Sequence, residues 1–196
     1  MRSEHQLHFS NSGNMDAVPS QSVHLVVTSP PYPMIEMWDE LFCRSAKIDK
    51  ALRSGDGNRA FELMHQMLDS VWDELYRILV PGGIVCINIG DATRTLNDRF
   101  ALYSNHTRIA SKMLSLGFSN LPNILWRKQT NAPNKFMGSG MMPPGAYVTL
   151  EHEYILVFRK GDKRLFKSAE EKTNRRQSAY FWEERNQWFS DVWMDL

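Results

Sequence analysis

The sequence has few cysteines and no long apolar run, and each of these absences excludes a class of protein. Only Cys43 and Cys86 occur among the 196 residues. Two distant thiols suggest neither a disulfide framework nor a cysteine metal site, which fits a reducing cytoplasm. No stretch of about 18 apolar residues is present, and the amino terminus has no apolar signal region. We therefore expect a cytoplasmic protein that neither enters nor crosses a membrane.

An excess of one charge is also missing. Lys and Arg number 23 and Asp and Glu number 22, which gives a net charge of +1. A protein that binds nucleic acid without specificity usually carries a clear basic surplus. Any contact with a polyanion must therefore be local in this chain.

The residues that are present suffice for one globular domain. Hydrophobic residues make up 42% of the chain and aromatic residues 11%, which is enough for a substantial core at this length. After Gly161 the composition becomes charged and weakly apolar, and then strongly aromatic. We expect a folded portion over residues 1–161 and a charged linker with an aromatic tail over residues 162–196.

Local patterns predict a strand, a helix and a second strand in the first half of the chain. Residues 22–29 form a short β-branched run that is typical of a buried parallel strand. Apolar residues three or four apart over 61–79 predict an amphipathic helix, which Pro-Gly-Gly at 81–83 should end. Residues 84–90 predict the second buried strand. The order indicates a crossover unit and a parallel sheet of the α/β class.

Further along the chain, the patterns predict another helix and a pair of strands. The helix covers about residues 107–116, and the strands cover 123–129 and 152–161. The connection between the strands is rich in Gly, Pro and Met and contains no obvious helix. We therefore expect an antiparallel hairpin at the edge of the sheet, with a long loop between its strands.

The first predicted strand ends in an unusual corner, Thr28-Ser29-Pro30-Pro31-Tyr32. Ligands of open parallel sheets bind beyond the carboxyl ends of the strands, where this corner lies. Two prolines fix the backbone, so the Pro30 carbonyl points in one direction and Pro31 offers no N–H to occupy it. With the Ser29 hydroxyl and the Tyr32 ring, the corner can hold a planar heterocycle that carries an exocyclic amine.

These residues resemble the amino-methyltransferases of DNA. The similarity lies in TSPPY, LVPGGIVCINIGD, ILWRKQTNAPNKF and EHEYILVFRKG, which follow the order of the permuted β-class, where the catalytic motif precedes the cofactor motif. It covers roughly residues 10–161 and the ending SDVW. The resemblance implies a Rossmann-like methyltransferase sheet with helices on both faces. It also implies S-adenosylmethionine as cofactor, double-stranded DNA as partner and a role in restriction–modification.

The mechanism of that family, carried over to this sequence, assigns catalytic roles to Ser29, Pro30, Pro31 and Tyr32. Ser29 and the Pro30 carbonyl would accept hydrogen bonds from the target amine, and the methyl group would pass directly, without a covalent enzyme intermediate. Tyr32 would stack on a base swung out of the duplex. Family members with Ser in the first position tend to methylate N4 of cytosine, and those with Asp or Asn N6 of adenine. Cytosine is therefore the favoured target, and adenine is the alternative.

The resemblance also suggests cofactor contacts by Asn14, Asp16, Ser29 and Asp91. Asp91 closes the second predicted strand and could face the pocket, although an Asp after Gly is also a common helix cap. Asn14 and Asp16 lie where a preceding strand of the family ends near the cofactor adenine. An exposed loop is the alternative for both.

Charged residues around the long loop form a second group of candidates. Five of them could contact DNA phosphates or could form a solvated cluster: Arg127, Lys128, Lys135, Arg159 and Lys160. His152 and Glu153 match the family only through the last block, and we expect them to support the hairpin.

One element of the family is missing from the sequence. No predicted strand is followed by the Gly-rich turn that cradles the methionine end of the cofactor, and GSGMMPPG at 138–145 follows a loop and begins no helix. In the permuted order that portion would follow SDVW. We therefore expect a sheet that lacks the Gly-loop strand, which would be supplied by a second polypeptide in a split enzyme. A homo-oligomer and a truncated or decayed gene product are the alternatives.

Two other classes of function stay open. The same corner could serve methylation of RNA or of a protein glutamine amide, although Ser29 argues against the glutamine version. A non-catalytic module that binds DNA or a partner is the third possibility, and the missing cofactor motif is the feature that favours it.

Overall fold

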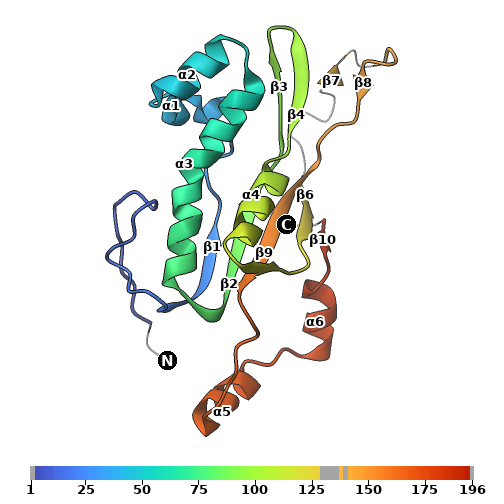
Figure 1. Cartoon of the computed structure of the whole chain (residues 1–196). Coiled ribbons are helices and arrows are strands. Elements are labelled where there is room, and N and C mark those ends of the chain that lie inside the picture. Colours follow the sequence, from blue (N-terminus) through green and yellow to red (C-terminus); the bar gives the residue numbers. More distant parts are fainter. Residues whose placement is uncertain (1–2, 129–136, 139–140, 195–196) are drawn as a thin grey trace.

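The computed structural model describes residues 3–128, 137–138 and 141–194, and its centre is a mixed sheet (Figure 1). The strand order is β1 (Val23–Thr28), β2 (Leu79–Ile89), β9 (His152–Lys160), β6 (Ile124–Arg127) and β10 (Val192–Trp193), with β5 (Phe118–Asn120) also paired to β9. β1 and β2 are parallel, whereas β9 runs antiparallel to β2 and to β6. The predicted α/β class with a Rossmann-like sheet is confirmed.

The predicted strand, helix and second strand are present. α3 (Gly57–Ile78) connects the two parallel strands, and the Asp56 side chain caps it by accepting a hydrogen bond from the Arg59 amide. The helix ends as predicted, but Pro-Gly-Gly at 81–83 lies inside β2 and not before it. The register between β1 and β2 shifts at this point, and Gly82 has a φ of 80°. A glycine can adopt this left-handed conformation without strain, so the strand passes through an irregularity instead of starting after it.

The predicted antiparallel hairpin forms from β6 and β9, with Ile124 opposite Ile155. It does not lie at the outermost position, because β10 pairs in parallel with β6. β1 lies at the other end of the strand order and pairs with β2 alone among the described strands. The second edge of β1 is therefore open in the described part of the chain.

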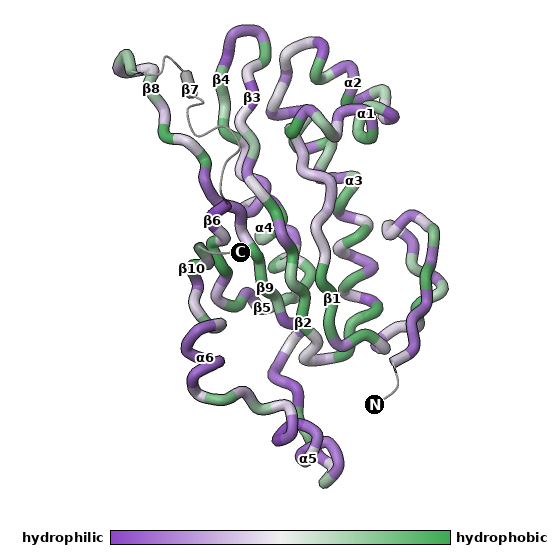
Figure 2. Tube along the Cα trace, turned by 180° about the vertical axis from the view of Figure 1, so that it is seen from behind, coloured by the Kyte–Doolittle hydropathy of each residue, from purple (hydrophilic) through white to green (hydrophobic). Residues whose placement is uncertain are grey.

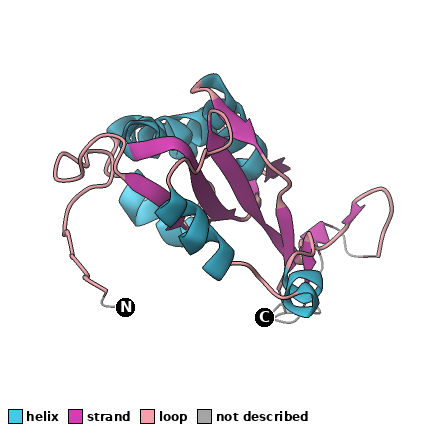
Figure 3. Ribbon diagram, turned by 90° about the horizontal axis from the view of Figure 1, so that it is seen from below, coloured by secondary structure: helices cyan, strands magenta, loops and turns pink. Residues whose placement is uncertain are grey.

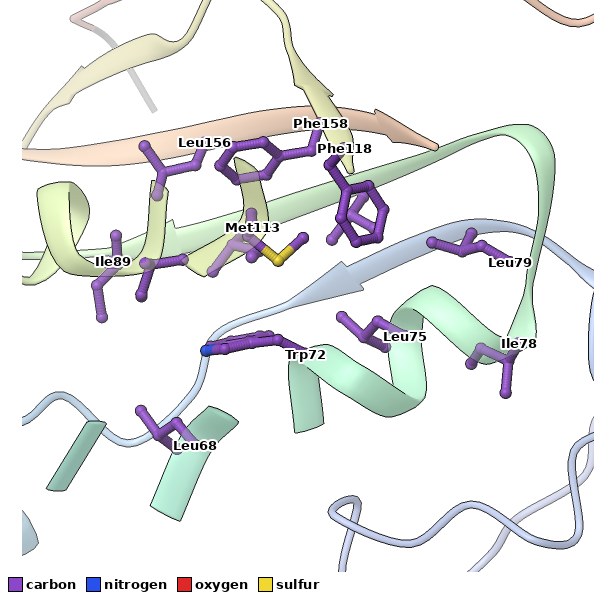
Figure 4. Packing of buried hydrophobic residues seen from close by; sticks show 13 residues of the cluster. Leu68, Trp72, Leu75, Ile78, Leu79, Ile89, Met113, Phe118, Leu156 and Phe158 are labelled. Carbon is purple, nitrogen blue, oxygen red and sulfur yellow. The ribbon is translucent and has the colours of Figure 1, made fainter. Parts of the chain in front are cut away.

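The core lies between the sheet and two helices. α3 and α4 (Asn105–Ser115) pack against each other and against one face of the central strands, as Figure 4 shows for Trp72, Met113 and Phe158. The buried members are Leu68, Trp72, Leu75, Ile78, Leu79, Val85, Ile87, Ile89, Ile109, Met113, Phe118, Leu156 and Phe158. The second helical layer implied by the resemblance is formed by neither α3 nor α4.

On β1, two apolar side chains remain exposed. Leu25 is 57% exposed and Val27 is 74% exposed. Val26, which points the opposite way along the strand, packs against the core. Figure 2 shows β1 as a largely hydrophobic strand.

A second core, which the patterns did not predict, surrounds the amino-terminal half of α3. It contains α1 (Asp39–Phe42), α2 (Ala46–Arg53) and the hairpin of β3 (Ala92–Leu96) and β4 (Arg99–Tyr103), after the short 3-10 helix η1 (Glu36–Trp38). The turn of the hairpin is Asn97-Asp98, and both residues have positive φ. Asn and Asp tolerate this conformation, which matches the twist of a two-residue hairpin.

The remaining elements are short or lie in the tail. They are β7 (Met137–Gly138), β8 (Ala146–Tyr147), α5 (Ala169–Gln177) and α6 (Trp182–Trp188). The view from below shows α6 and the amino-terminal segment on opposite sides of the molecule (Figure 3). Phe181 and Trp182 are exposed, and the division at residue 161 stays a prediction. No helix within the described ranges has the length and apolar character needed to cross a membrane.

Candidate active site

The corner at residues 28–34 leaves the carboxyl end of β1 as a tightly held turn. Pro30, Pro33 and Met34 are buried, whereas Ser29 is exposed. Met34 has a φ of 67°, a left-handed conformation that a large non-glycine residue adopts only when its surroundings enforce it. Its amide faces the Met64 sulfur at 3.3 Å. The sequence therefore builds a rigid corner whose serine faces outward.

Tyr32 is the centre of a polar network that joins three strands' ends. Its Oη donates to Glu153 Oε2 at 2.9 Å and accepts from Asn88 Nδ2 at 2.8 Å. Asn88 also donates to Glu153 Oε2 at 2.7 Å, and Lys128 Nζ lies 2.7 Å from Glu153 Oε1. Both oxygens of Glu153 are thus occupied, which leaves this carboxylate to hold the tyrosine and not to act as a base.

Burial raises the pKa of Tyr32 to about 12, and the negative charge of Glu153 acts in the same direction. The phenol is therefore neutral at physiological pH. Ser29 Oγ lies 3.3 Å from Tyr32 Oη. Because the Tyr32 proton points to Glu153, Ser29 is the donor in this contact. The lone pairs of Ser29 are left free for an incoming N–H group.

Gly90 allows the Tyr32 ring to lie close to the end of β2. A Cβ atom at this position would come within 3.2 Å of Tyr32 Cε2 and 3.2 Å of Glu153 Cγ. Most Cβ contacts are looser than this, so a larger residue would displace the ring or the carboxylate.

A hollow of about 180 Å³ lies beside the Tyr32 ring, lined by Tyr32, Ile35, Gly90, Asp91, Lys128 and residues 150–153. A larger cavity of about 550 Å³ lies elsewhere, between the turn at 54–58 and the β3–β4 hairpin. It contains none of the predicted site residues, so we place the site at the smaller hollow, where the polar network converges.

Asp91 lines this hollow but is engaged with α4. Its carboxylate accepts from the His106 backbone N–H at 3.1 Å and lies 2.8 Å from His106 Nδ1. The helix-cap alternative thus describes its observed contacts, and its role toward a cofactor stays a prediction.

Asn14 and Asp16 lie away from the corner. The Asp16 amide donates to Asn14 Oδ1 at 3.0 Å, and the neighbouring Met15 amide donates to Glu74 near the end of α3. This places the pair near the start of β1, whereas Ser29 follows its end. The structure does not bring them together with Ser29 and Tyr32, and their cofactor role stays a prediction.

Most of the basic candidates have partners. Arg127 pairs with Glu151 at 3.0 Å, Lys128 with Glu153, and Arg159 donates to the Gly161 carbonyl. Lys160 donates to the Leu79 carbonyl at 2.9 Å. Lys135 lies outside the described residues. A phosphate role for the described four stays a prediction.

Sequence reasoning missed Asn88 as a member of the site and gave Glu153 only a supporting role in the hairpin. A signal for Asn88 exists, since it is the polar residue in the otherwise apolar run IVCINI. Glu153 carries no such signal, because it meets Tyr32 only through the pairing of β9 with β2.

Comparison with known proteins gives a consistent result. The N6/N4 methyltransferase family model, described as DNA methylase, matches residues 23–195. The Type II methyltransferase M.MthZI of Methanothermobacter thermautotrophicus is 56% identical over 198 residues, which cover 100% of this chain and 56% of the relative. The Type II methyltransferase M.MjaI of Methanocaldococcus jannaschii is 51% identical, over 96% of this chain and 66% of the relative. The chain thus spans less than two thirds of these curated relatives.

Solved structures agree with the sequence matches. TTHA0409 of Thermus thermophilus, described as a DNA modification methylase, is 31% identical with a TM-score of 0.66, over 92% of this chain and 63% of that one. A second structure of TTHA0409 is complexed with S-adenosyl-L-methionine. The cytosine-N4-specific PvuII DNA methyltransferase has a TM-score of 0.58 at 14% identity, over 92% of this chain and 52% of that one. At this identity the last likeness shows the fold alone.

Proposed function

This chain belongs to the N6/N4 DNA methylase family, and on that premise we propose that it carries the base-binding part of an S-adenosylmethionine-dependent DNA methyltransferase. The observation that carries the proposal is the outward-facing Ser29 beside a Tyr32 locked by Asn88 and Glu153. The two Type II relatives favour a role in restriction–modification.

The corner supplies acceptors for an amine. Ser29 keeps lone pairs free, and the rigid Pro30-Pro31 backbone directs the Pro30 carbonyl. Two acceptors on an exocyclic NH₂ draw its lone pair out of conjugation with the ring. S-adenosylmethionine, when bound, supplies an activated methyl group. Tyr32 stacks on the extruded base, a contact worth about 1–3 kcal/mol.

Tyr32 stays protonated during this work. The raised pKa of its phenol keeps it neutral, and its proton remains on the Glu153 side. A neutral ring beside the base avoids repulsion with the electron-rich face of the target. Its three polar neighbours fix the plane of the ring before the base arrives, which reduces the ordering needed on binding.

We propose N4 of cytosine as the target, because Ser29 stands where adenine enzymes of the family tend to carry Asp or Asn. N6 of adenine is the alternative. The two amines differ in the ring that carries them and not in the chemistry of the clamp.

The residues described fit the amine-accepting side of the reaction and only part of the cofactor side. Among the described strands, neither β1 nor β2 is followed by a glycine-rich turn that opens a helix. A cradle for the methionine end must therefore come from another segment. We propose that this segment pairs with the open edge of β1 and covers Leu25 and Val27, because exposed apolar side chains next to an unpaired edge favour strand addition.

The test is methyl transfer to duplex DNA by this chain together with a polypeptide that corresponds to the remainder of its longer relatives. Digestion of the DNA and mass spectrometry distinguish N4-methylcytosine from N6-methyladenine. We expect N4-methylcytosine. Appearance of N6-methyladenine would contradict the choice of base but not the enzyme class.

Two substitutions test the corner in the same assay. Ser29→Ala and Tyr32→Ala should each lower kcat by about a hundredfold or more, since each removes a contact to the reacting base. Ser115→Ala and Tyr180→Ala, on exposed surfaces away from the corner, serve as matched controls. Unchanged transfer by both corner variants would overturn the catalytic assignment.

A non-catalytic binding module is the second candidate, favoured by the missing glycine turn. It predicts DNA binding without methyl transfer even when the complementary polypeptide is present. The same pair of assays therefore separates the two functions.

A further inference from the structure

A buried amide, Asn105, connects three parts of the chain behind the corner. It is the first residue of α4 and is fully buried. Its Nδ2 donates to the Pro33 carbonyl at 3.1 Å and to the Gly90 carbonyl at 2.9 Å. Pro33 directly follows Tyr32, and Gly90 directly follows β2. One side chain thus fixes both segments that carry the candidate site.

The geometry determines the orientation of the amide and the tautomer of its neighbour. Because both N–H groups of Asn105 point to carbonyl oxygens, its Oδ1 must face His65 Nε2, which lies 2.9 Å away. An oxygen can only accept, so the Nε2 atom of His65 carries the proton. His65 Nδ1 is buried and has no hydrogen-bond partner within the described residues. A second proton on this ring would therefore lack an acceptor.

His65 is thus held as a neutral donor. It is fully buried on α3, and the Phe61 ring contacts it edge-on with the centroids 4.6 Å apart. The charged groups around it are Arg108 of α4 and Glu62 and Asp69 of α3, and Arg108 pairs with both acids. Burial lowers the pKa of His65 to about 4. Its role toward Asn105 therefore persists at neutral pH.

We propose that Asn105 and His65 are positioning residues that hold the Tyr32 corner against the end of β2. Neither touches the hollow, and both act through the backbone of Pro33 and Gly90. Asn105 sets the distance between these two carbonyls, and His65 sets the rotation of the Asn105 amide. The strained φ of Met34, next to Pro33, is kept in place by the same clamp. The catalytic meaning of the clamp rests on the proposed function, but its structural meaning does not.

The first test follows the Tyr32 ring in this chain alone, by NMR with ¹³C-labelled tyrosine at neutral pH. A Tyr32→Phe variant assigns the signal. We expect Asn105→Ala to shift the Tyr32 signal toward that of an exposed tyrosine. A matched control is Asn123→Ala, which removes a hydrogen bond to the Val157 amide far from the corner. It should lower the melting temperature and leave the Tyr32 signal in place.

His65 provides variants that keep Asn105 itself intact. His65→Gln retains an N–H donor for Asn105 Oδ1, whereas His65→Leu keeps the bulk and removes the donor. We expect the Tyr32 signal to stay near the wild-type position in the first and to move in the second. This pair also serves if Asn105→Ala does not fold.

The second test measures kinetics with the complementary polypeptide present. Asn105→Ala and His65→Leu should lower kcat by about tenfold or more while KM for DNA changes by less than about threefold, because a misplaced ring affects the reacting geometry more than the binding surface. His65→Gln should recover most of kcat.

A Tyr32 signal that does not move in Asn105→Ala and His65→Leu would overturn the inference, whatever the kinetics show. If the wild-type assembly transfers no methyl group, the proposed function fails while the NMR result still decides the clamp. A moved signal with an unchanged kcat would confine the clamp to structure and contradict its role in positioning for catalysis.

Discussion

At the scale of single residues, the molecule places neutral groups where charged ones would be expected. Tyr32 keeps its proton because burial and Glu153 disfavour the phenolate. His65 loses its proton because burial disfavours the imidazolium. Both shifts have the same cause, the loss of solvation around a potential charge, and both preserve a donor at a fixed atom. The donors point to Glu153 and to Asn105, so protonation states and geometry support each other.

His65 makes stability depend on pH in a definite direction. Its pKa falls from 6.5 to about 4 on folding, so between these values the unfolded chain binds a proton that the folded chain does not. Its contribution to stability is complete above pH 6.5 and is lost as the pH falls toward 4. Between pH 7 and pH 5 the loss should be about 2 kcal/mol.

The measurement is urea unfolding of the wild type and of His65→Gln at both values of pH. The wild type should lose more free energy of unfolding than the variant, since carboxylates such as Glu62 titrate in both proteins. Equal losses would show that His65 binds its proton equally in the folded and unfolded chains.

At the scale of elements, the two helices of the core are held together by one guanidinium. Arg108 of α4 contacts Glu62 at 3.0 Å and Asp69 at 2.9 Å, both on α3, and only 19% of its side chain is exposed. A planar group with several donors can serve two carboxylates at once. The contact lies one turn beyond Asn105, and it fixes α4 relative to α3 and hence to the corner.

Arg108→Ala should lower the free energy of unfolding by about 1–3 kcal/mol, because it leaves two carboxylates that face each other without their cation. Arg108→Lys should recover only part of this loss, since an ammonium cannot reproduce the fork. Chemical denaturation measures both. Full stability in the alanine variant would mean that solvent screens the pair completely.

The elements that could be predicted from sequence are those whose signals are local. β1, α3 and the hairpin of β6 and β9 follow from period and turn residues, and the corner follows from its own five letters. The parts that could not be predicted depend on long separations. Glu153 lies 121 positions from Tyr32, and Asn105 lies 72 positions from Pro33. Nothing near Asn105 in the sequence distinguishes it from an ordinary residue at the start of a helix.

The β3–β4 hairpin and α2 were missed for a related reason. The stretch at 53–59 contains Gly, Asp and Asn and indicates only a turn, which it is, between α2 and α3. The helix before it has few apolar residues of its own and forms because Ile48 and Ala51 are buried against the second core. Tertiary packing thus decided a segment for which local preference was weak.

At the scale of the whole molecule, β1 is exposed on one edge. Val27→Lys introduces a charge where we propose that a further strand docks. A lysine on an edge strand disfavours strand addition. The variant should be more monomeric than the wild type in light scattering, and it should lose copurification with the complementary polypeptide.

Leu165→Lys, at a comparably exposed position in the tail, provides the control and should change neither property. Copurification that survives the Val27 substitution would place the docking surface elsewhere on the molecule.

The open edge of β1 also bears on how much active protein a cell can contain. Under the proposal above, the corner is finished in one polypeptide and its neighbouring strand arrives with another. Surplus copies would then keep a sticky edge and become clients of chaperones and proteases. The extent of modification would follow the scarcer polypeptide, so gene dosage of the two parts would have to be matched.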